Sequence, residues 1–290
     1  MTLDRPVQSG IFLAGLLVLA ALDMVFAPGP LTQALLLAPA VALLGLPHGA
    51  LDLPMARVLW PLTGAADHML FYGAYIGIAG AVAALWWLAP GLALIAFLAY
   101  SALHFSGDWE MDGLLLRIAG GLSVIGAPAL FHVTDVVSIF SVLSHGVWAE
   151  PIAYAIAVAG LIGASLGLIA LLQMSRHARE ALLELVGIWI GAAILPPLLY
   201  FIAYFCLLHS LRHMRDTLQA LPERKAALRA AAGIMVVSLL GASIALGLFL
   251  HVDGVDLESS VLRVVFIGLA ALTVPHMLLV ERFRHRRLSA

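Results

Sequence analysis

Long apolar stretches alternate with short polar segments along the whole chain. A transmembrane helix needs about 20 mostly apolar residues, and about ten of these stretches reach or approach that length. They cover residues 10–26, 31–46, 68–88, 91–105, 114–131, 152–173, 181–195, 197–213, 230–250 and 261–280. The pattern predicts an all-α fold, a polytopic integral membrane helical bundle with about ten (8–10) transmembrane segments. We expect a single transmembrane helical domain over residues 1–290.

Composition supports a membrane protein and excludes several functions. The chain is 63% hydrophobic and 11% charged, and its mean hydropathy is +1.05. A soluble domain is nearer half apolar and a quarter charged. The net charge of -2 argues against a nucleic acid partner. The single cysteine, Cys206, excludes an internal disulfide and a multi-cysteine metal site. The single lysine, Lys225, lies in a charged loop, which argues against a retinal Schiff base within the bundle.

Basic residues predict the orientation, because Lys and Arg favour cytoplasmic loops. Threading the segments from a cytoplasmic N-terminus places the basic residues after the sixth, eighth and tenth segments inside, Arg212 among them. The loops 132–151 and 251–260 contain no Lys or Arg and fall outside. We therefore expect a multi-pass protein of the cell (inner or plasma) membrane, surrounded by lipid, with both termini cytoplasmic.

Four histidines lie near the predicted inner ends of these segments. His209 and His213 are four residues apart, so a helix places both on one face, one turn apart. Two such imidazoles can bind one metal ion, although they could also be plain interface residues at a helix end. His48 and His104 end two other segments at the same depth, as a metal site between facing helices requires. All four are therefore candidate metal ligands.

Two aspartates repeat the same spacing. Asp52 follows His48 by four residues, and Asp108 follows His104 by four. A ligating histidine usually donates its other ring N–H to a carboxylate or carbonyl, which fixes the tautomer. The aspartates could take that supporting role, could be ligands, or could be ordinary helix-end carboxylates near the headgroups. His276, in the inner half of the last segment, is a further candidate for a supporting role.

The backbone at these motifs is expected to be irregular. Pro47 and Gly107 both predict broken helix ends, since proline lacks the N–H of a helix interior and glycine is a poor helix former. Irregular backbone at membrane depth is tolerated only where it is buried or lines a cavity. Imidazole ligands suit Fe, Cu, Ni or Zn, and the absence of cysteine from the set disfavours structural zinc. Spacing alone does not choose iron.

The motifs resemble those of the Brp/Blh-type β-carotene 15,15′-dioxygenases, which are bacterial and archaeal membrane proteins. The string Gly-Leu-Pro-His-Gly-Ala-Leu-Asp at residues 45–52 carries the resemblance. His-Phe-x-x-Asp at 104–108, His-x-x-x-His at 209–213 and Pro-His at 275–276 follow in the same order, so the resemblance spans roughly residues 40 to 280. Ser106 stands where the family pattern has glycine.

The resemblance implies an activity and a cofactor. Fe²⁺ would be held by the histidines matching His48, His104, His209 and His213. O₂ would cleave the central double bond of β-carotene, or of a related carotenoid, to give two molecules of retinal. A functional link to a retinal-binding rhodopsin is also implied.

Three alternatives remain at this stage. Another membrane metal-dependent lipid oxidase or hydroxylase would need more histidine clusters than the one His-x-x-x-His pair present. A transporter using the histidines as a transport site would favour polar residues throughout the depth of several helices. A non-enzymatic pigment-assembly protein would differ from the enzyme in metal content.

Overall fold

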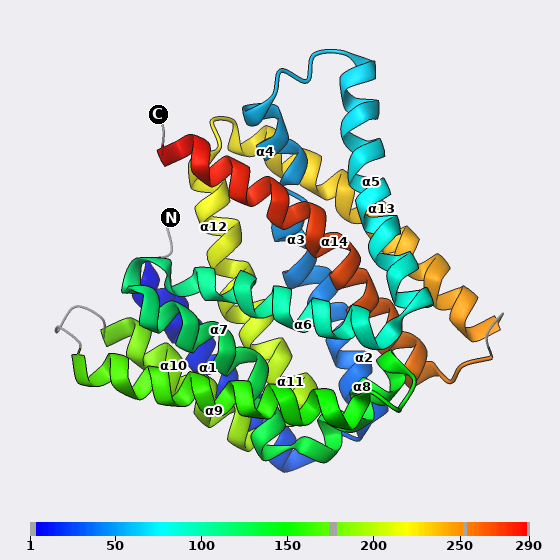
Figure 1. The fold of residues 1–290 in the computed structure, drawn as a ribbon. Helices are drawn as coiled ribbons and strands as arrows, with labels where there is room; N and C mark the ends of the chain where they lie inside the picture. The colour runs from blue at the N-terminus through cyan, green and yellow to red at the C-terminus, as the bar shows by residue number, and fades with distance from the viewer. Residues whose placement is uncertain (1–3, 174–178, 252–253, 289–290) are drawn as a thin grey trace. The chain divides into compact units, whose positions relative to one another are not determined.

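The fold is helical throughout the described residues, with no strand among them (Figure 1). The computed structural model describes residues 4–173, 179–251 and 254–288, and the side chains of residues 48, 287 and 288 lie outside that description. The elements are α1 (Arg5–Phe26), α2 (Pro30–Ala40), η1 (Val41–Gly45), α3 (Leu46–Gly49), α4 (Asp52–Leu59), α5 (Ala65–Leu88), α6 (Pro90–Ser106), η2 (Gly107–Asp112), α7 (Leu114–Phe131), α8 (Val133–Ser144), α9 (Ala149–Gln173), α10 (Arg179–Ile194), α11 (Pro197–Phe201), η4 (Ile202–His209), α12 (Ser210–Ala220), α13 (Arg224–His251) and α14 (Leu257–Leu288).

The prediction of an all-helical polytopic membrane protein is confirmed. Seven helical segments in the described residues are long and apolar enough to cross a membrane, namely α1, α5, α6 with η2, α7, α9, α13 and α14. The stretch Pro30–Gly45 and α8 are shorter apolar helices. The predicted segments 181–195 and 197–213 correspond to α10 and to the succession α11, η4 and the start of α12.

Helix α8 corrects one expectation, because residues 132–151 were expected to form a loop. Val136, Phe140 and Leu143 are buried at helical spacing, so one face of this twelve-residue helix packs inward. At twelve residues the helix is shorter than a full transmembrane span, so its apolar run resembles a connection in the sequence.

The chain divides into two compact units, each built from two separate stretches. Unit 1 comprises Met1–Leu37 and Pro90–Arg212, and unit 2 comprises Ala38–Ala89 and His213–Ala290. Each unit is described here by itself. The single domain over residues 1–290 stays a prediction.

In unit 1, α7 and α9 lie side by side and approach at small residues (Figure 1). A Cβ atom on Gly126 would overlap the backbone of Gly160, and one on Gly163 would lie 2.8 Å from the backbone nitrogen of Ser123. Close backbone approach through small residues is a common way for membrane helices to pack.

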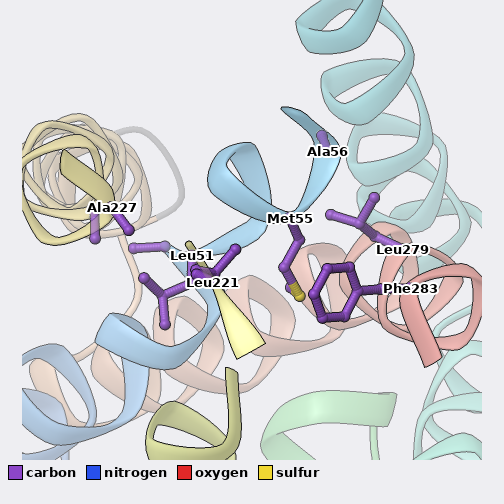
Figure 2. Close-up of a cluster of buried hydrophobic side chains, with 9 residues drawn as sticks. Leu51, Met55, Ala56, Leu221, Ala227, Leu279 and Phe283 are labelled. Carbon is purple, nitrogen blue, oxygen red and sulfur yellow. The ribbon is translucent and has the colours of Figure 1, made fainter. Parts of the chain in front are cut away.

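In unit 2, a cluster of buried side chains fastens α4 to α14 and to the start of α13 (Figure 2). Met55 of α4 lies beside the ring of Phe283, and Leu51 lies beside Leu221 (Figure 2). Arg286 Nη1 donates to the carbonyl oxygens of Val58 and Leu59, at 2.5 and 2.7 Å, and so caps the C-terminal end of α4.

The N-terminal end of α14 is also capped. Asp256 Oδ1 accepts a hydrogen bond of 3.0 Å from the backbone N–H of Ser259. This backbone donor lowers the pKa of the Asp256 carboxyl. The start of the last long helix is therefore defined by its own sequence.

Candidate functional site

Two histidines, an aspartate and a tyrosine meet in unit 1. Nδ1 of His209 lies 3.2 Å from Oδ2 of Asp108, and the Tyr204 hydroxyl donates to the same oxygen at 2.7 Å. On the other side of the His209 ring, Nε2 lies 3.0 Å from Nε2 of His104. The His209 side chain is almost fully buried, at 3% exposure. The sequence separations, 96 residues for Tyr204 and 101 for His209 from Asp108, mean that the fold creates this group.

The break after α6 positions Asp108. Helix α6 ends at Ser106, and Gly107 begins the 3₁₀ turn η2, as the glycine predicted. Trp109 has non-helical angles (φ -115°, ψ 25°) and is buried against α7, where a Cβ on Gly120 would overlap its ring. The indole therefore anchors the turn that carries Asp108.

A π-helical segment positions the two partners of Asp108. Tyr204 and His209 are five residues apart in η4, which is π-helical over Ile202–His209. In an α-helix, residues five apart differ in direction by about 140°, at 100° per residue. The wider i→i+5 turns of a π-helix bring such residues toward one face. The two rings lie 6.2 Å apart at 29°, and both therefore reach one carboxylate.

The paired rings fit a metal ion. Because a carboxylate only accepts, Nδ1 of His209 is the donor to Asp108, and Nε2 keeps the lone pair. Two imidazole nitrogens bound at right angles to one metal, each at about 2.1 Å, would lie about 3.0 Å apart. The observed 3.0 Å between the Nε2 atoms matches that value. An N–H···N hydrogen bond has the same length when no metal is bound.

A buried ion network supports the same turn. Arg212 Nη1 donates to the backbone oxygen of Asp108 at 3.0 Å, and Nη2 pairs with Glu184 at 2.5 Å. Arg5 and Ser9 of α1 donate to Glu184, at 3.3 and 2.5 Å. Arg212 is only 7% exposed, so counting it among the cytoplasmic loop charges was wrong. Its partners lie far away in sequence, so no local pattern could have identified them.

Unit 2 contains a similar group. Nδ1 of His276 lies 2.6 Å from Oδ1 of Asp52, and the Tyr75 hydroxyl donates to Oδ2 of Asp52 at 2.7 Å. Asp52 and His276 are each 3% exposed. The His213 ring lies 5.0 Å from the His276 ring, at 75°. The His48 side chain lies outside the described residues.

Each of the two aspartates hydrogen-bonds a histidine from another helix, and the expected pairing of Asp52 with His48 involves a side chain outside the described residues. The hydrogen bonds seen for Asp52 and Asp108 go to His276 and His209 of other helices. The backbone between each motif histidine and its aspartate is not a continuous α-helix. Residues 50 and 51 form a turn after α3, and η2 replaces the α-helix after Ser106, so four-residue spacing no longer sets a common face.

The described residues bring together two pairs of histidines, and no complete metal site. No group of three or more His, Cys, Asp or Glu side chains in those residues is arranged to hold a metal ion. His104 and His209 belong to unit 1, and His213 and His276 belong to unit 2. A centre with all four predicted ligands stays a prediction.

The fold and these groups define a class, a polytopic helical membrane protein with buried His–Asp–Tyr groups. A family model described as "Beta-carotene 15,15'-dioxygenase" matches residues 39–284. A curated relative of the same name from an uncultured marine bacterium, 66A03, is 31% identical over 255 residues, which is 83% of this chain and 90% of the relative. The chain belongs to the β-carotene 15,15′-dioxygenase family. No solved structure matches it.

Proposed function

We propose that the protein is an iron-dependent membrane dioxygenase that cleaves the central double bond of β-carotene, or of a related carotenoid, to give two molecules of retinal. The observation that carries this proposal is the family match, which covers residues 39–284 and so includes every candidate histidine. The marine bacterial relative is aligned over 90% of its own length, so the likeness is not confined to one motif.

The metal ligands in this proposal are His48, His104, His209 and His213. Bound iron would supply the binding and activation of O₂. The 3.0 Å spacing of the His104 and His209 nitrogens supports two of these ligands. Asp108 accepts a hydrogen bond from Nδ1–H of His209, so the lone pair of the ring stays on Nε2.

The membrane fold suits such a substrate. β-Carotene is wholly apolar and dissolves in the lipid layer, so an enzyme embedded there meets it without extracting it into water. The long helices expose large apolar side chains, such as Met69, Leu70 and Ile76 of α5. In this proposal, apolar side chains near the metal would align the polyene so that one double bond reaches the reactive centre. Cleavage of an alkene by O₂ requires no nucleophile or general base from the protein.

The test is expression in a β-carotene-producing bacterium supplied with iron, with pigments separated by chromatography. We expect the wild-type chain to consume β-carotene and to form retinal. His209→Ala should abolish retinal formation and lower the iron content of the purified protein, while the protein stays in the membrane.

His132→Ala is the matched control. His132 lies between α7 and α8, where its ring faces Asp135 at 3.9 Å. This variant should keep wild-type activity. Intact β-carotene in cells whose membranes contain the iron-loaded wild-type protein would overturn the proposal.

A further inference from the structure

Among the described residues, a similar arrangement of two histidines, an aspartate and a tyrosine occurs in each unit. In unit 1 the His104 and His209 rings lie 4.7 Å apart at 74°, and in unit 2 the His213 and His276 rings lie 5.0 Å apart at 75°. One ring of each pair presents Nδ1 to a buried aspartate, and each aspartate accepts a tyrosine hydroxyl at 2.7 Å.

From this correspondence we infer that His276 is a metal ligand, held by Asp52 and Tyr75 as His209 is held by Asp108 and Tyr204. The inference rests on the proposed metal site and adds an imidazole that neither the motif spacing nor the resemblance places among the ligands. The Nδ1 hydrogen of His276 goes to Asp52, so Nε2 carries the lone pair that a metal needs. The ring beside it, His213, is itself a proposed ligand.

Side-chain contacts of Asp52 and Tyr75 position this histidine. His276 follows Pro275 inside α14, where the proline removes one helical hydrogen bond. The Tyr75 hydroxyl lies 3.4 Å from the carbonyl oxygen of Leu272 as well as against Asp52. One tyrosine therefore connects the carboxylate to the turn of α14 that carries the histidine.

A purely structural role explains these contacts less well. The cluster of Met55, Leu279, Phe283 and their neighbours already fastens α4 to α14 (Figure 2). Burying a carboxylate and an imidazole in an apolar protein costs free energy that a second apolar contact would not. A role in binding a metal ion explains why this cost is tolerated.

The experiment measures metal binding directly. Purified, iron-stripped wild-type protein, His276→Gly and Asp52→Asn are titrated with Fe²⁺, and with Co²⁺ as a visible-absorption probe of the ligand set. We expect Asp52→Asn to weaken metal binding by about 10–100-fold, as for other groups that orient a ligating histidine. His276→Gly should weaken it more, and should change the Co²⁺ bands. Added imidazole should restore those bands, which a structural role would not produce.

Tyr200→Phe is a control for the loss of one buried side-chain hydrogen bond outside the proposed ligand set, because the Tyr200 hydroxyl donates to the Val124 carbonyl at 3.3 Å. Its metal affinity should stay at the wild-type value. Wild-type metal affinity and unchanged Co²⁺ bands in a folded His276→Gly variant would overturn the inference. If instead the wild-type protein binds no iron and forms no retinal, the proposed function itself fails.

Discussion

The Asp108 carboxylate accepts two side-chain hydrogen bonds inside an apolar protein, one from the Tyr204 hydroxyl and one from Nδ1–H of His209. A buried carboxylate is costly unless such donors satisfy its oxygens. Beside a ligating imidazole, it also fixes the tautomer and makes the ring a better ligand. Without a metal, the same geometry would be only a satisfied His–Asp pair. Metal affinity is therefore the property that separates the two roles.

Asp108→Asn tests this role. The amide keeps the size of the side chain but loses the charge, and its NH₂ group can favour the wrong tautomer of His209. We expect metal affinity to fall by roughly 10–100-fold, with retinal formation falling in parallel. Iron titration of the purified variant, beside Tyr200→Phe, measures the effect. Wild-type affinity in Asp108→Asn would assign the carboxylate to packing alone.

The histidines and aspartates were identifiable from sequence because their motifs are short and local. The side chains that surround them, and the ion network of Glu184, could not be identified from sequence. Glu184 meets Arg212 across 28 residues and Ser9 across 175, and Tyr75 meets Asp52 across 23. Contacts at such separations depend on tertiary packing, and no periodicity marks them in advance.

At the scale of elements, long apolar runs predicted the bounds of α5, α7 and α9 to within a few residues, because the bilayer dictates their length. Two shorter elements could not be predicted from the sequence, for physical reasons. Helix α8 is too short for a span, and the π-helical η4 has the composition of an ordinary apolar helix. Yet η4 is the element that turns Tyr204 and His209 toward one carboxylate.

Small residues determine how closely α7 and α9 pack. A Cβ on Gly126 would meet the backbone of Gly160, which cannot rotate away, so Gly126→Ala must separate the helices. We expect a destabilisation of about 1–3 kcal/mol, as for other overpacked sites. Gly233 in α13 has open space around it, and Gly233→Ala should stabilise the helix by roughly 0.5–1 kcal/mol. Thermal unfolding in detergent compares the two, and equal midpoints would contradict the close contact.

At the scale of the whole molecule, each unit combines two stretches remote in sequence, and one boundary falls between Arg212 and His213. That boundary lies inside α12, within the His-x-x-x-His motif. No linker or change in composition marks it, so sequence alone could not predict the division. The distribution of Lys and Arg along the chain, in contrast, predicts the orientation of the protein in the membrane, with both termini cytoplasmic.

Cysteine labelling tests that orientation, because the native thiol, Cys206, is fully buried. A cysteine introduced at an exposed position should then be the main site of reaction. Val147, before α9, is 84% exposed and lies in a stretch without Lys or Arg. Glu223 is exposed in the basic connection before α13. In intact cells, a membrane-impermeant maleimide should label Val147→Cys and spare Glu223→Cys until the membrane is opened, since basic connections stay cytoplasmic. Labelling of Glu223→Cys alone would reverse the orientation.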